Sequence, residues 1–125
     1  MIKPNWEWIF QRLEETKEYI NNPDPEYLVP ELKYFVLMEE FLTKLKATEI
    51  VIPTFIVSVL SWGDEHFEIS WMREKICAII DFDKNQIEIC WYPEFNSEMI
   101  EISDVDKFVK IVNELYFSLE KTDEN

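Results

Sequence analysis

The chain has 125 residues, of which 47% are hydrophobic and 15% aromatic, which is enough for one folded domain and argues against disorder. Its 26 acidic residues outnumber 12 basic ones and give a formal charge of −14, which disfavours direct binding to nucleic acid or to an anionic membrane. We expect a single domain over residues 1–125, with its core at about 4–120.

The glycine content, the apolar stretches and the cysteine count indicate the cellular compartment and the kinds of site that we expect for this protein. The single Gly argues against a Gly-rich phosphate loop. No stretch approaches the roughly 20 apolar residues of a membrane span, and the N-terminus, MIKPNWEW, lacks the apolar segment of a signal peptide. Two cysteines do not make a disulfide framework. We therefore expect a cytoplasmic protein with free thiols and no cofactor.

Two helices are expected in the first part of the chain. The first begins at Pro4 and is stopped by Asn21 and the prolines that follow it. Its apolar side chains recur at three- and four-residue spacing: Trp6, Ile9, Phe10, Leu13 and Ile20. The second runs from near Pro30 to Lys46. Its apolar stripe consists of Tyr34, Phe35, Met38, Phe41, Leu42 and Leu45.

The stretch from His66 to Tyr92 carries the strand signal. It contains three runs rich in Ile, Phe and Trp, HFEISW, ICAIIDF and IEICWY, separated by the tetrapeptides MREK and DKNQ. Such runs bounded by turn residues predict a three-stranded antiparallel meander. If the two tetrapeptides close the hairpins, Phe67 lies opposite Ile80 and Phe82 lies opposite Ile87.

This register separates the side chains by polarity, because successive residues of a strand point to opposite faces. One face is wholly apolar, with Phe67, Ile69, Trp71, Ile76, Ala78, Ile80, Phe82, Ile87, Ile89 and Trp91. The other is mostly polar, with His66, Glu68, Ser70, Cys77, Ile79, Asp81, Glu88, Cys90 and Tyr92. Here Cys77 and Cys90 are diagonal neighbours at about 7–8 Å, which is long for a disulfide.

The flanking segments complete the expected fold. Residues 50–60 read as extended, and Pro53 limits them to an edge strand, two short pieces or a buried connection. A last short strand is expected at Met99–Ile102, and Ser103, with Asp106 three residues on, looks like the N-cap of a final helix. The sequence predicts a two-layer α+β domain. Two N-terminal helices and one C-terminal helix pack on one face of an antiparallel meander of three to four strands.

The meander also resembles a segment of small uncharacterised bacterial and phage proteins. The residues that carry the resemblance are a strand ending in Trp, an Ile-alternating hairpin around Asp-Lys-Asn and a closing aromatic residue. The resemblance covers residues 52–92, and the matched positions are apolar or turn residues. It therefore implies an α+β fold and transfers no functional residue.

One cluster on the polar face has the elements of a metal or acid–base site. His66, the only histidine, shares a cross-sheet row with Asp81 and Glu88 in the predicted register. The alternative, which we favour, is that all three are solvated residues of an open sheet face. No Ser-His-Asp, Cys-His or zinc-ligand spacing is present, so we do not expect an enzyme.

Charge placement gives the stronger functional indication. No basic residue lies between Lys84 and Lys107, and this interval combines acidic with aromatic side chains. The candidate interface is Glu88, Tyr92, Glu94, Phe95, Glu98, Glu101, Asp104 and Asp106. Such a surface suits a partner protein whose natural ligand is a phosphate backbone. The alternative is a solvated sheet edge followed by ordinary acids at a helix start.

Two functions from different classes follow. The leading hypothesis is a non-enzymatic inhibitor of the immunity or anti-defence type. It would occupy the basic site of a nuclease, a toxin or a nucleic-acid-guided complex, by analogy of size and charge. The alternative is a chaperone-like or small-ligand-binding α+β domain with an apolar groove near Phe55. A homodimer is open in either case.

Overall fold

The computed structural model describes residues 3–18, 31–59, 67–71, 75–92 and 96–123, with side chains as far as residue 119. In order, these residues form α1 (Trp6–Lys17), α2 (Leu32–Lys46), β1 (Ile56–Val59), β2 (Phe67–Trp71), β3 (Ile76–Asp81), β4 (Gln86–Trp91), β5 (Asn96–Glu101) and α3 (Val105–Asp123). The predicted α+β fold is confirmed. The antiparallel sheet has five strands in the order β1-β2-β3-β4-β5, against the three to four predicted.

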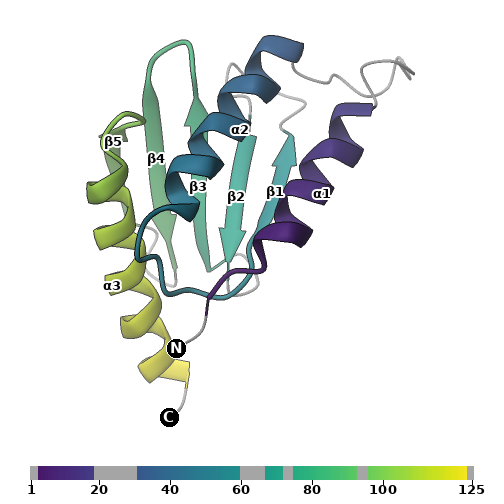
Figure 1. Cartoon of the computed structure of the whole chain (residues 1–125). Coiled ribbons are helices and arrows are strands. Elements are labelled where there is room, and N and C mark those ends of the chain that lie inside the picture. Colours follow the sequence, from purple (N-terminus) through teal and green to yellow (C-terminus); the bar gives the residue numbers. More distant parts are fainter. Residues whose placement is uncertain (1–2, 19–30, 60–66, 72–74, 93–95, 124–125) are drawn as a thin grey trace.

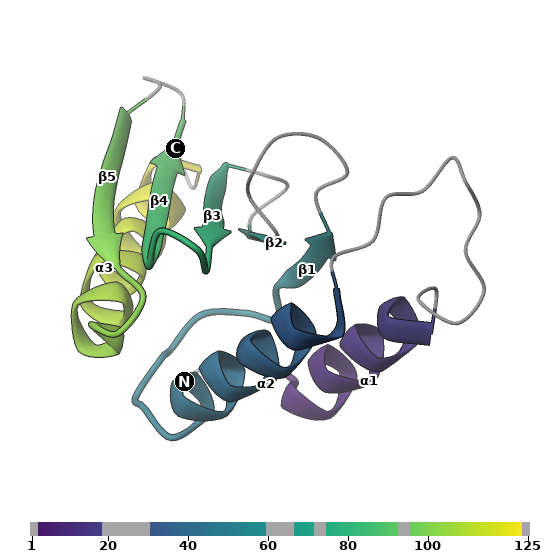
Figure 2. The ribbon, with the colours of Figure 1, turned by 90° about the horizontal axis from the view of Figure 1, so that it is seen from above.

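The three described helices lie on one side of the sheet (Figure 1). Seen from above, α1 and α2 lie side by side toward the β1 edge, and α3 runs close to β4 and β5 (Figure 2). The Asn113 side chain ties α3 to the connection before β1. It accepts a hydrogen bond from the Val51 amide at 3.1 Å and donates one to the Glu49 carbonyl at 3.3 Å. The helices therefore cover one sheet face and leave the other open.

The covered face is the apolar face that the alternation predicts. The strand residues that point toward the helices are buried: Phe67, Ile69, Trp71, Ile76, Ala78, Ile80, Ile87 and Ile89. Phe82 and Trp91 are partly buried at its margin. Edge-to-face ring pairs join the two layers, with Phe35 against Phe67 at 5.2 Å, and tie the helices together, with Phe41 against Phe108 at 5.6 Å.

The first predicted hairpin register is confirmed, with Phe67 opposite Ile80. The second is wrong by two residues, because Ile87 lies opposite Ile80 and not opposite Phe82. The loop is residues 82–85. It is held by the Asp81 carboxylate, which accepts hydrogen bonds from the amides of Asp83 at 3.0 Å and Lys84 at 3.1 Å. A shift of two keeps every side chain on its predicted face.

Helix ends and edge strands show further differences. The N-cap of α3 is Asp104 and not Ser103, since the Asp104 Oδ1 accepts a hydrogen bond from the Lys107 amide at 3.3 Å. The last strand begins at Asn96, three residues before the predicted start. The extended segment after Pro53 ends in the short edge strand β1. The N-cap of α1 is Asn5, and the Ile20 that was predicted to end its stripe lies outside the described residues.

Two adjacent isoleucines of β3 test which face is covered. Ile80 is fully buried beneath the helices, whereas Ile79 points to the open face and is half-buried. We predict that Ile80→Ala lowers the free energy of unfolding by about 2–5 kcal/mol, because it leaves a cavity in the core. Ile79→Ala, the matched control, should cost about 1 kcal/mol or less. Urea unfolding of both variants measures the difference, and equal losses would contradict the assignment of the faces.

Candidate functional site

The predicted acidic interface lies at the β5 edge of the sheet and the start of α3. Glu88 is on β4, Glu98 and Glu101 are on β5, and Asp104 and Asp106 precede and begin α3. All but the half-buried Glu88 are exposed. Tyr92 is exposed directly after β4. Glu94 and Phe95 lie outside the described residues.

The strand register places these acids on both sides of one edge. Glu88 lies opposite Met99 and Glu101 lies opposite Gln86, so these side chains share the open face. Glu98 lies opposite the buried Ile89 and therefore points to the helix side, where it is nonetheless exposed. Met99 stands between the acids on the open face with 51% of its surface exposed. The sequence patterns singled out no role for Met99, because they did not identify β5 as a complete edge strand.

The acids differ in how far the fold itself explains them. Asp104 caps α3, and Asp106 lies in its first turn, where negative charge stabilises the helix. Glu98 and Glu101 belong to a strand, in which Glu is an unfavourable residue. Within the described residues neither side chain makes an ion pair. Local folding therefore accounts for the aspartates but not for the two glutamates.

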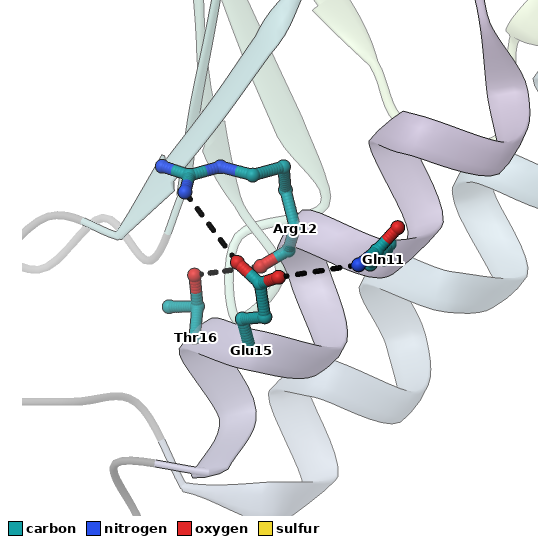
Figure 3. Close-up of polar contacts among 4 residues, drawn as sticks. All are labelled: Gln11, Arg12, Glu15 and Thr16. Carbon is teal, nitrogen blue, oxygen red and sulfur yellow. Dashed lines mark hydrogen bonds and ion pairs between the residues drawn. The ribbon is translucent and has the colours of Figure 1, made fainter.

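Glu14 and Glu15 of α1, by contrast, have nearby partners, and Glu14 pairs with Lys17 at 3.5 Å. Glu15 accepts hydrogen bonds from Gln11 at 3.4 Å and from Arg12 at 3.5 Å, and Thr16 donates to the Arg12 carbonyl at 2.9 Å (Figure 3). The Arg12 guanidinium also lies 5.8 Å from the ring centre of the exposed Trp8. These contacts between exposed residues three or four positions apart are typical of a solvated helix face.

The predicted cluster of His66, Asp81 and Glu88 does not form as expected. Asp81 lies opposite Gln86 and not opposite Glu88, as a consequence of the shifted hairpin. Its side chain is 6% exposed and is engaged in the turn, so it is not the solvated residue expected. His66 lies outside the described residues. Asp81 and Glu88 instead line one open-face hollow of about 140 Å³, with Ile79, Lys84, Gln86 and Met99.

Nothing in the described part of the chain gathers three or more His, Cys, Asp and Glu side chains in a way that would hold a metal ion. The expected apolar groove near Phe55 is also filled. Phe55 is fully buried, and its ring packs against Trp6 at 5.6 Å and Trp71 at 5.3 Å. No observation at this position favours the small-ligand-binding alternative.

The two cysteines are directly opposite each other on β3 and β4, which corrects their predicted diagonal placement. The Tyr92 amide donates to the Lys75 carbonyl at 3.0 Å, so by alternation Cys77 and Cys90 form a hydrogen-bonded pair with about 5.5 Å between Cα atoms. Cys77 and Cys90 do not form a disulfide with each other. The Cys90 thiol lies 3.4 Å from a Glu88 oxygen.

The surroundings of Cys90 make it a poor nucleophile. Burial, and after it the hydrogen bond to Glu88 and the negative charge of Glu88, together raise the pKa of Cys90 from 9.0 to about 12. Because the thiolate is the reactive form, Cys90 is almost wholly protonated at neutral pH. The thiol pair is therefore no ready catalytic centre.

The thiol chemistry can be checked in a Cys77→Ser chain, where Cys90 is the single cysteine. We predict that its alkylation by iodoacetamide is slow and that the rate still rises with pH well above 9.0, the ordinary thiol pKa. Adding Glu88→Gln should speed alkylation, because removing the neighbouring charge lowers the Cys90 pKa. A rate that levels off at the same pH as in the urea-unfolded chain would contradict the raised pKa.

None of the helices in the described part of the chain is both long enough and apolar enough to span a membrane. Comparison with known proteins gives no relative, since no family model, curated protein or solved structure matches the chain. Function is therefore inferred from the residues and their geometry.

Proposed function

We propose that this chain is a non-enzymatic binding protein that places its acidic β5 edge in a basic, nucleic-acid-binding site of a partner protein. The partner would be a nuclease, a toxin or a nucleic-acid-guided complex, and the chain would act as an inhibitor of the immunity or anti-defence type. In this role its carboxylates stand in for the phosphates of the partner's natural ligand.

The observation that carries the proposal is the exposed surface around Met99. Glu101 on β5 and Glu88 on β4 adjoin this exposed apolar residue on the open face, and Glu98 lies next to it on the helix side of the edge. Glu98 and Glu101 make no ion pair within the described residues. An apolar contact point surrounded by charge is the arrangement expected of a protein interface, in which a buried anchor is ringed by polar residues. A purely solubilising surface needs the charge but not the exposed Met99.

The placement of charge supports a basic partner over an uncharged one. Glu88, Asp104 and Asp106 extend the negative surface from the open face to the start of α3. Lys84 lines the same open-face hollow as Glu88, and Lys107 is exposed beside Asp106, so the surface is predominantly negative with these two cations at its margins. A predominantly negative field speeds encounter with a positive surface, and salt weakens this effect.

Charge reversal on β5 tests the proposal. The Glu98→Lys/Glu101→Lys chain should lose its partner in affinity capture from the cells that encode it, because attractive contacts become repulsive. The matched control is Glu39→Lys/Glu40→Lys, which changes two exposed acids of α2 and shifts the net charge equally. For the purified partner we expect binding at least about tenfold weaker with the β5 variant and unchanged with the control.

Salt and nucleic acid provide the second measurement. The dissociation constant of the complex should rise steeply with salt, and the partner's own nucleic acid should displace the chain. A complex that tolerates both β5 substitutions, or that binds nucleic acid at the same time, would contradict the proposed function. Thermal unfolding of each variant controls for loss of fold.

A further inference from the structure

β5 is a free edge of the sheet. Among the described strands it is the last in the sheet order, and α3 lies close to it on the helix side of the sheet (Figure 2). The opposite edge strand, β1, has four residues and lies next to α1, and the Asn5 amide donates to Thr54 Oγ1 at 2.8 Å just before β1 begins. β5 has six residues and contains no Pro or bulge, and its charged residues Glu98 and Glu101 protect it against pairing with an edge of like charge.

The hydrogen-bond alternation of β5 shows which backbone groups face outward. The Ile102 amide donates to the Asn85 carbonyl at 3.2 Å, in register with the β4–β5 ladder. Asn96, Glu98 and Ile100 therefore direct their amides and carbonyls toward β4. The backbone groups of Ser97, Met99 and Glu101 point away from the sheet, except that the Glu101 carbonyl accepts from the Asp104 amide at 3.1 Å. Three outward amides and two outward carbonyls remain.

The side chains along this edge select the strand that would pair with it. Glu98 on the helix side and Glu101 on the open side place a negative charge on each face of the edge. A second copy of β5 carries the same negative charges, and a register with Glu98 opposite Glu98 places like charges directly against each other, which is destabilising. A strand carrying Lys or Arg at these positions has the complementary charge, and an apolar residue fits beside the exposed Met99.

We propose that β5 takes up an extended, Lys- or Arg-bearing segment of the partner protein as a sixth strand of the sheet. The outward backbone groups of Ser97, Met99 and Glu101 supply the hydrogen bonds, and the charges of Glu98 and Glu101 select the segment. The inference rests on the proposed function, since it states how the partner of the same surface is held. It requires backbone pairing, which the proposed function alone does not.

A synthetic peptide provides the probe. In the sequence Lys-Thr-Val-Lys-Thr-Thr, antiparallel pairing puts the first Lys beside Glu101, the Val beside Met99 and the second Lys beside Glu98. We expect this peptide to shift the β5 amide resonances of the isotope-labelled full chain in a saturable way. It should also slow hydrogen exchange at the outward amides of Ser97, Met99 and Glu101, since these become hydrogen-bonded.

Met99→Pro separates backbone pairing from charge. Proline at this position removes an outward N–H and leaves the β4–β5 ladder and every glutamate in place. We predict peptide binding at least about tenfold weaker than for the matched control Met99→Thr, which keeps the amide. A peptide whose β5-facing amides are N-methylated should bind the wild-type chain with similarly reduced affinity, because those amides can no longer donate hydrogen bonds. N-methylation at the alternate amides should be tolerated, and this comparison does not depend on the folding of a variant.

Each outcome decides the inference. Equal binding to the Pro and Thr variants, or tolerance of N-methyl groups at the facing amides, would show that charge alone holds the peptide. That result would overturn strand addition and leave the proposed function standing. Absence of peptide binding to the wild-type chain would also overturn it. So would a concentration-dependent dimer that Met99→Pro abolishes, because the edge would then take a second copy.

Discussion

The structure depends on the two-residue alternation of apolar and polar side chains in β2, β3 and β4. Ile80 is buried under the helices, while its neighbours Ile79 and Asp81 point to the other face. Every inward position must be apolar, because the helices pack directly on it. The charged residues of these strands are consequently confined to the open face. The division into a face covered by helices and a polar face therefore follows from strand geometry.

The same constraint explains why the candidate interface lies at an edge. The three described helices occupy one face, so the remaining places for exposed side chains are the open face, the sheet edges and the helix surfaces. At the β1 edge, α1 and the Asn5–Thr54 contact lie close to the strand. At the β5 edge the two glutamates and Met99 remain exposed, with backbone groups directed outward. Charge, an apolar contact point and hydrogen-bonding capacity thus occur together at one place.

Sequence reasoning recovered the faces of the sheet but not the full register. The apolar pattern fixes which face of the sheet each side chain takes, and a register shift of two residues leaves every side chain on the same face. The deciding residues are Asp81, whose carboxylate holds the turn, and Asn85, whose positive φ of 54° is tolerated by Asn. Both residues have well-known turn preferences, so the sequence contained the information that places this loop at residues 82–85. The sequence prediction began the loop one residue later, with the tetrapeptide DKNQ.

The candidate site was predictable only in part. The fold distributes the acids of the interval without basic residues over β4, β5 and the start of α3, and the strand alternation placed Glu88 on the open face. The full length of β5 could not be inferred from NSEMIE, because these residues have little preference for strands and the strand depends on its pairing with β4. The position of Glu98 on the helix side, and the exposure of Met99, follow from that pairing and not from any local pattern.

Residue-resolved hydrogen exchange of the isolated chain tests most directly that β5 is an open edge in the stated register. We expect exchange rates to alternate along the strand. The amides of Glu98, Ile100 and Ile102, which point to β4, should exchange slowly, and those of Ser97, Met99 and Glu101 should exchange fast. Uniform protection would show that the edge is already paired, and the reverse alternation would show that the register is wrong. Either result would contradict the account.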